Sequence, residues 1–255
     1  MPKPTTQNLY GGSVVAELTT RMWGDKEIQK YKVTDSGSEV ADLIRVTEAL
    51  GVINKPALIP WAAKMTTRYL ADYMGQPITS ELLDEARKNF RNIRDEAADL
   101  GTAVHNWIES YIKKGVKDLP DDERILNGIT AFLRWTKEND VQFISSERMV
   151  YSREHHYIGT MDAEAIVNGN RCVMDWKTSK GIWNEMRYQV AAYQIAAIEE
   201  GSEYAGPRWI IRFDKGTSEF EAHELPLEDL SFDMEAFLAA LTLKRRELKL
   251  KQPNV

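Results

Sequence analysis

Hydrophobic and polar positions alternate along the chain with two different periods, and these periods predict a mixture of helices and strands. Apolar residues that recur once per helical turn are typical of amphipathic helices, whereas strict alternation of apolar and polar residues is typical of half-buried strands. On this basis we expect strands within residues 14–33 and at 142–152, 159–168, 171–177, 208–213 and 219–225. We expect helices at 60–74, 81–114, 122–139, 184–200 and 227–250.

The order of these elements predicts an α/β protein in which a central mixed β-sheet is flanked by α-helices. With 255 residues, of which 43% are hydrophobic, the chain is long enough for one compact domain of this class. No repeat, low-complexity tract or Gly/Ser-rich linker divides it. We therefore expect a β-rich N-terminal extension over residues 1–45 and the main domain over residues 46–255, with residues 1–8 frayed.

Composition and charge narrow the classes of function. No apolar run approaches the ~18 residues of a membrane span. Neither a signal-peptide core nor an Arg-rich presequence is present, so we expect a cytoplasmic protein without a membrane partner. Cys172 is the only cysteine, which excludes an intramolecular disulfide and a cysteine-ligated iron–sulfur cluster. The formal net charge of −6 argues against a protein that coats duplex DNA, because such binding depends on neutralised phosphates.

One expected hairpin carries the clearest chemical signal. Asn168-Gly169 lies between two β-prone runs, and Asn-Gly is the strongest short-range signal for a two-residue type I′ turn. Counting outward from this turn in an antiparallel ladder places Asp162 directly opposite Asp175. Lys177 shares the face of Asp175, because side chains two positions apart on a strand point the same way.

Two carboxylates opposed across a ladder repel each other, so a positive charge is expected between them. Mg²⁺ and Mn²⁺ are suitable, because they prefer carboxylate, carbonyl and water oxygens. The alternative is a solvated surface hairpin with ordinary polar residues. The apolar run 173–176 speaks against it, because such a run is typical of a central strand, in which a buried aspartate needs a partner. Two further acids are weaker candidates: Glu164, opposite Val173 in the same count, and Glu147.

Together with their neighbours, these residues resemble the PD-(D/E)XK nuclease superfamily, in particular its RecB-like branch and the phage-encoded exonucleases of that branch. Gly159-Thr160-Met161-Asp162 is similar to the glycine-led first half of the bipartite motif, and Asp175-Trp176-Lys177 to the second half. Gln189 and Tyr193 match the Q-x-x-x-Y helix that follows in this branch. Gly101-Thr102-Ala103-Val104-His105 is similar to its upstream histidine motif. In the first half, methionine stands where the superfamily name has proline.

The named motifs fall within residues 95–200, and residues 46–61 resemble the same exonucleases more loosely. The resemblance implies a restriction-endonuclease-like core, so that residues 46–255 would form the nuclease domain. It also implies hydrolysis of phosphodiester bonds with the help of one or two Mg²⁺ or Mn²⁺ ions, which would polarise the phosphate and activate water.

Carried over residue by residue, the resemblance assigns metal binding to His105, Asp162, Asp175 and the backbone carbonyl of Trp176. It assigns the orientation or deprotonation of the attacking water to Lys177. Further residues are expected to contact DNA or to support the site: Glu109, Thr178, Lys180, Arg187, Gln189 and Tyr193.

Three of these residues have plain structural alternatives. A single histidine in a helical run is more often a core or cap residue than a ligand, and only the family motif favours a metal ligand at His105. Glu109 lies one turn beyond it and could hold its imidazole. Gln189 and Tyr193 could equally form a polar pair at a helix edge, although a helix that follows the metal-binding strand can direct both side chains into the cleft.

Basic and aromatic residues bear on DNA binding. One basic group is expected near the cleft: Lys177, Lys180, Arg187, Arg208 and Arg212. A second group is more typical of a solvated helix face than of a DNA clamp: Lys244, Arg245, Arg246, Lys249 and Lys251. Trp61, Tyr69 and Tyr73, with Lys64 and Arg68, could line a channel for single-stranded DNA or belong to the core, and we favour the core for Trp61.

We therefore expect a metal-dependent DNA exonuclease that acts on single-stranded DNA or on single-stranded ends, in recombination, repair or replication. Recombination or replication proteins are candidate partners. The first alternative is a structure-directed or restriction-like endonuclease, since the same metal chemistry serves both. A second is a catalytically silent DNA-binding recombination partner. A third, an intracellular structural protein, leaves the opposed aspartates unexplained.

Overall fold

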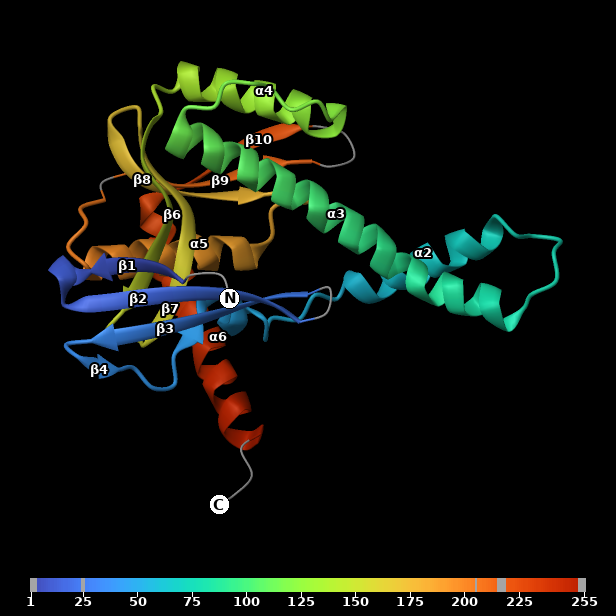
Figure 1. Ribbon diagram of the computed structural model, residues 1–255, viewed down its shortest axis with the longest axis horizontal. Coiled ribbons are helices and arrows are strands. Elements are labelled where there is room, and N and C mark those ends of the chain that lie inside the picture. Colours follow the sequence, from blue (N-terminus) through green and yellow to red (C-terminus); the bar gives the residue numbers. More distant parts are fainter. Residues whose placement is uncertain (1–3, 24–25, 205, 215–218, 252–255) are drawn as a thin grey trace.

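The computed structural model describes residues 4–23, 26–204, 206–214 and 219–251, and their backbone forms two β-sheets with helices around the larger one (Figure 1). The smaller sheet is antiparallel and comprises, in spatial order, β1 (Thr5–Leu9), β2 (Val14–Trp23), β3 (Lys26–Asp35) and β4 (Ser38–Glu39). Its apolar face packs on the larger sheet, because both contribute to one buried cluster: Leu9, Val14, Ala16 and Val33 with Met149, Tyr151 and Ile158.

The start of the chain corrects one expectation. Residues 1–8 were expected to be frayed, but residues 5–9 pair with β2 along their whole length and bury Leu9 in the interface between the sheets. Burial of that side chain and the ladder hydrogen bonds offset the entropy of ordering the segment. Residues 1–3 lie outside the described part of the chain.

The larger sheet contains the expected hairpin at its centre. Its strands are, in chain order, β5 (Ile44–Arg45), β6 (Gln142–Ser152), β7 (Tyr157–Val167), β8 (Asn170–Lys177), β9 (Arg208–Phe213) and β10 (Phe220–Leu225). In space they follow the order β10-β9-β8-β7-β5, with β6 paired to β7. The sheet is mixed, since β5–β7 and β8–β9 are parallel and the other pairs antiparallel. The expected α/β class is confirmed, and the main domain begins slightly before residue 46, because β5 belongs to its sheet.

Helices cover both faces of this sheet. They are α1 (Val46–Leu50), α2 (Leu58–Ala71), α3 (Ser80–Lys114), α4 (Glu123–Glu138), α5 (Asn184–Glu199) and α6 (Leu230–Lys251). On one face, Ile108 of α3 and Phe132 of α4 pack against Trp176 of β8. On the other face α1, α5 and α6 pack together, and Phe237 of α6 meets Tyr157 of β7 edge-on at 4.8 Å between ring centroids. Short 3₁₀ segments lie at Tyr10–Gly12 and Leu227–Asp229.

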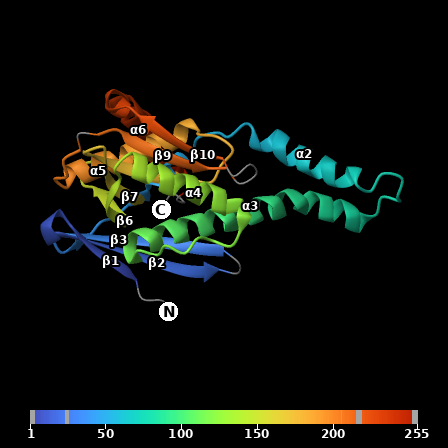
Figure 2. The same cartoon turned by 90° about the horizontal axis from the view of Figure 1, so that it is seen from above.

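Helix α2 and the first half of α3 form an arm that extends away from the two sheets (Figures 1 and 2). Aromatic contacts hold the two helices together: Trp61 meets Phe90 edge-on at 6.4 Å between ring centroids, and the Tyr69 hydroxyl donates to Glu85. The expectation that Trp61 belongs to the main core is therefore wrong, because it is half-buried within the arm. Several apolar side chains of the arm and its connections are exposed: Leu58, Ile59, Met74, Ile78 and Leu83.

Two smaller expectations concern burial and membranes. Cys172 is a free, fully buried thiol in the core beneath α3 and α4, as expected for a small apolar residue. In the part of the chain that the structure describes, no helix combines the length and the apolar character needed to cross a bilayer.

Candidate metal centre

The β7–β8 hairpin has the turn and the register that the sequence indicates. Both residues of the Asn168-Gly169 turn have positive φ, 48° and 81°, as a type I′ turn requires. Val167 pairs with Asn170, and Glu164 pairs with Val173, as counted. The ladder continues regularly up to the pair between residues 163 and 174.

Beyond that pair the two strands separate, so Asp162 and Asp175 are not ladder partners. The Asp162 carboxylate instead accepts a hydrogen bond from the backbone N–H of Trp176 at 2.7 Å. Strand β8 continues beside β9, where Asp175 is paired with Ile210. Because β7 and β8 separate here, both carboxylates reach one cavity. A ladder that continued would leave less space at this position.

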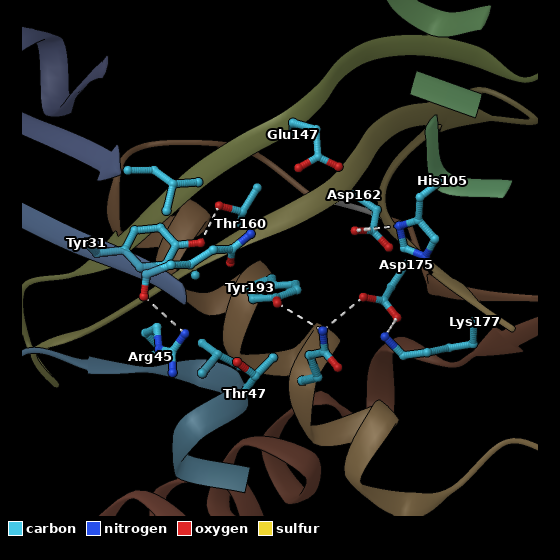
Figure 3. A pocket seen from close by; sticks show the side chains of 15 residues that line it. Tyr31, Arg45, Thr47, His105, Glu147, Thr160, Asp162, Asp175, Lys177 and Tyr193 are labelled. Atoms are coloured by element: carbon cyan, nitrogen blue, oxygen red, sulfur yellow. Dashed lines mark hydrogen bonds and ion pairs between the residues drawn. The ribbon is translucent and has the colours of Figure 1, made fainter. Parts of the chain in front are cut away.

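This cavity has a volume of about 290 Å³, and most of the expected site residues line it (Figure 3). They come from five elements of the main domain: His105 from α3, Glu147 from β6, Asp162 from β7, Asp175 and Lys177 from β8, and Gln189 and Tyr193 from α5. The histidine motif, both halves of the bipartite motif and the Q-x-x-x-Y helix therefore meet in space, although 88 positions separate His105 from Tyr193 along the chain.

Three of these side chains could hold a metal ion. Donor atoms of His105, Glu147 and Asp162 all lie within 4.8 Å of one another, and the His105 Nδ1–Asp162 Oδ1 distance is 3.8 Å. In Figure 3 the three side chains face one another. One imidazole nitrogen and carboxylate oxygens form a donor set that suits Mn²⁺ or Mg²⁺. Glu147 was only a weak candidate from the sequence, and the structure places it beside the two stronger ones.

The charges at the site favour a cation. Burial and then the neighbouring Asp162 carboxylate raise the pKa of Glu147 to about 7. Burial raises the pKa of Asp175 to about 6, although the adjacent Lys177 ammonium opposes that rise. Carboxylates held this close and this deep are stabilised in their charged form when a divalent ion lies between them. The residues present therefore fit the metal that the sequence motifs imply.

Asp175 is the most deeply buried acid of the cavity, with 1% of its surface exposed, and it is held from two sides. The Lys177 ammonium forms an ion pair with one carboxylate oxygen. The Gln189 amide donates to the other at 3.0 Å, and the same Nε2 lies 2.9 Å from the Tyr193 hydroxyl, which accepts. Gln189 and Tyr193 thus hold Asp175 in place, and the interpretation of a polar pair at a helix edge does not apply.

Two glycines of the motifs explain how the elements approach so closely. A Cβ atom on Gly159 would lie 2.5 Å from Cε1 of Tyr193, so the tyrosine ring packs directly on β7. A Cβ atom on Gly101 would lie 2.6 Å from Oγ1 of Thr178, so α3 rests on the end of β8. Thr178 therefore supports the site from outside the cavity, at the contact that brings His105 to it.

Two acids that the sequence indicated are used elsewhere. Glu109 forms an ion pair with Lys113 at 2.7 Å and does not line the cavity, so it does not hold the His105 imidazole. Glu164 is buried and accepts hydrogen bonds from Arg171 at 2.6 Å and from Tyr204 at 2.8 Å. Both expectations are corrected. Counting positions along a strand or helix predicts the face on which a side chain lies, but it does not show which side chains pair with it there.

The basic residues expected near the cleft are corrected for the same reason. Of that group only Lys177 lines the cavity, and Lys180 is exposed outside it. The three arginines pair with acids of other elements: Arg187 with Asp229 and Asp233, Arg208 with Asp233, and Arg212 with Asp214 and Glu221. The C-terminal basic group lies on α6 and is not only a solvated helix face. Lys251 and Lys244 pair with Glu247 of the same helix, but Lys244 also pairs with Glu48 of α1 at 3.6 Å, and Arg245 donates to the backbone carbonyl of His155.

The smaller sheet contributes a wall of the cavity that the sequence did not indicate. Leu18, Gln29 and Tyr31 line it, and the Tyr31 hydroxyl is hydrogen-bonded to Thr160 of β7 at 2.8 Å. Arg45, also in the lining, donates to the backbone carbonyl of Gln29 at 3.4 Å. No local sequence pattern indicates these contacts, because they join segments far apart along the chain.

Comparisons with known proteins leave the family open. No protein-family model and no curated protein matches the chain. One solved structure, titled "Crystal structure of SSO0001", is similar over 80% of this chain and 77% of that chain, with 16% identity and a TM-score of 0.37. At this identity and score, the function has to be argued from the chain's own site.

Proposed function

We propose that this protein is a divalent-metal-dependent deoxyribonuclease with a restriction-endonuclease-like core, and that it acts as an exonuclease on DNA ends that are single-stranded. The observation that carries the proposal is the meeting of His105, Glu147 and Asp162 with the Asp175–Lys177 pair in one cavity. We place its activity in the cytoplasm, in recombination, repair or replication.

The residues divide into metal ligands and groups that act on water. When bound, the metal ion would polarise the phosphodiester and favour hydroxide near neutral pH. His105, Glu147 and Asp162 would hold it, and the Trp176 carbonyl stays a predicted further ligand. Lys177 adds a positive charge and a group that can orient the attacking water or accept its proton. Gln189 holds the Asp175 carboxylate in position for the same centre.

The size of the cavity favours a single strand over a duplex as substrate. Its volume of about 290 Å³ lies just below the roughly 300–1,000 Å³ that is usual for small-molecule sites. Residues of the smaller sheet and of α5 line the cavity together with the acids (Figure 3). A single nucleotide fits a space of this size, whereas a base-paired duplex would have to be opened first.

The test is degradation of end-labelled linear single-stranded DNA beside closed circular single strands, in Mg²⁺, in Mn²⁺ and in EDTA. We expect metal-dependent loss of the linear DNA alone, and loss of that activity in Asp175→Asn. The matched control is Glu39→Gln, which also neutralises an acid, but an exposed one of β4 that pairs with Lys32 and does not line the cavity. Cutting of circles would identify an endonuclease instead. DNA retention without cleavage and without metal would identify a binding partner.

A further inference from the structure

Glu147 has a backbone conformation that residues with a side chain rarely adopt. Its φ is 55°, within strand β6, where extended backbone with negative φ is the rule. In the left-handed region the Cβ atom of an L-residue lies too close to backbone oxygen, so such a conformation persists only where neighbours hold it. The direction of the Glu147 carboxylate therefore depends on whatever fixes this backbone.

One side chain spans the irregular position. Gln7 of β1 donates from Nε2 to the backbone carbonyl of Glu147 at 2.8 Å. Its Oε1 accepts from the backbone N–H of Met149, also at 2.8 Å. A single amide thus satisfies the backbone carbonyl of Glu147 and the backbone N–H two residues further along the strand.

A second contact from the smaller sheet secures the neighbouring strand. Met149 is the ladder partner of Thr160 in the β6–β7 pair, and Thr160 is hydrogen-bonded to Tyr31. Gln7 of β1 and Tyr31 of β3 therefore each form a hydrogen bond with one member of the same ladder pair, Gln7 with Met149 and Tyr31 with Thr160. This pair lies beside the cavity, two positions along the ladder from Glu147 on one strand and from Asp162 on the other.

We infer that Gln7 is a positioning residue of the metal centre: its amide fixes the left-handed backbone of Glu147 and so presents that carboxylate to the metal beside His105 and Asp162. The inference rests on the proposed function and deepens it. The smaller sheet then helps to position a metal ligand, and the residue that does so lies near the start of the chain.

The experiment is a double-mutant cycle read by Mn²⁺ affinity, measured by calorimetry on the whole chain without DNA. Loss of a residue that orients a metal ligand typically costs about 10–100-fold in affinity, and we expect a loss of that size in Gln7→Ala. In a Glu147→Gln background, Gln7→Ala should cause no further loss, because the carboxylate that it positions is already absent. Asn8→Ala, at the exposed neighbouring position of β1, is the matched control and should bind as wild type.

A purely structural role of Gln7 gives a different pattern. Gln7→Met keeps the volume of the side chain and replaces Gln7→Ala in the cycle if the alanine variant does not fold, which thermal unfolding in EDTA would reveal. Unchanged affinity in the folded Gln7 variant, or an equal loss in both backgrounds, would overturn the inference. Absence of Mn²⁺ binding in the wild type would overturn it together with the proposed function. Tight Mn²⁺ binding without DNA cleavage would refute the proposed function alone, and the cycle would still decide the role of Gln7.

Discussion

Substitution of Gly159 by alanine tests whether the contact between α5 and β7 builds the site. The added Cβ would lie 2.5 Å from Cε1 and 3.2 Å from Cδ1 of Tyr193, and 3.2 Å from Cγ2 of Val46. Tyr193 is 2% exposed and Val46 is 1% exposed, so both are tightly packed and can be displaced only towards the cavity that they line. Overpacking of a closed core typically costs about 1–3 kcal/mol. For a chain of this size, that corresponds to a fall in Tm of about 2–12 °C.

Activity should fall as well, by a route that can be traced. Displacement of the Tyr193 ring moves the hydroxyl that accepts from Gln189, and Gln189 in turn holds Asp175. We therefore expect Gly159→Ala to lower the metal-dependent cleavage rate at a temperature where the variant is still folded. Tyr193→Phe removes the hydroxyl without adding volume, so it should lower the rate while changing Tm less than Gly159→Ala does.

The matched control is Gly181→Ala, in the connection between β8 and α5. A Cβ at that position would meet the ring of Trp183 at 3.6 Å, which is ordinary van der Waals contact. Thermal unfolding and cleavage of end-labelled single-stranded DNA are measured on both variants. Equal Tm values for wild type and Gly159→Ala, or equal losses in the two glycine variants, would refute the packing that we describe.

Three further predictions follow from the charges of the cavity. In EDTA the Tm should fall as pH rises from about 4 to about 7. The reason is that folding raises the pKa of Glu147 from 4.5 to about 7 and that of Asp175 from 3.8 to about 6, so the folded state binds these protons more tightly than the unfolded state. Glu147→Gln should make the fall in Tm with pH less steep, and an unchanged slope would contradict the assignment. Mn²⁺ at 100 times its Kd should raise the free energy of unfolding by about 2.7 kcal/mol, and Asp162→Asn should abolish most of that gain in thermal unfolding. Lys177→Met should lower the cleavage rate by about 10²-fold or more while Mn²⁺ affinity in calorimetry stays near the wild-type value; loss of both together would make Lys177 a structural residue.

Local signals explain why the elements were predictable. The hydroxyl of Thr79 accepts a hydrogen bond from the backbone N–H of Leu82 at the start of α3, and Gly115 ends that helix with φ of 64°. The β-prone runs at residues 142–152 and 208–213 predicted β6 and β9 with their observed bounds. Such signals depend on residues close in the sequence, and the sequence alone is sufficient to find them.

The site was predictable only as far as a regular ladder extends. Counting from the Asn168-Gly169 turn gives the observed register down to the pair of residues 163 and 174. The count fails at Asp162, because the Asp162 carboxylate accepts a hydrogen bond from the backbone N–H of Trp176 at the point where the ladder ends. The residues of the motif still meet in one cavity, because the meeting of their side chains does not require their strands to be paired at that point.

The sequence alone does not show which charged side chains have partners in distant segments of the chain. Arg187 looks like a DNA contact until Asp229 and Asp233, more than forty positions later, are seen to neutralise it. Glu147 looks like an ordinary strand residue until its positive φ and the hydrogen bond that its backbone carbonyl accepts from Gln7 are known. In both cases a charged side chain acquires its role from a contact across the fold. The proposed metal centre therefore depends on the docking of the smaller sheet as well as on its motifs.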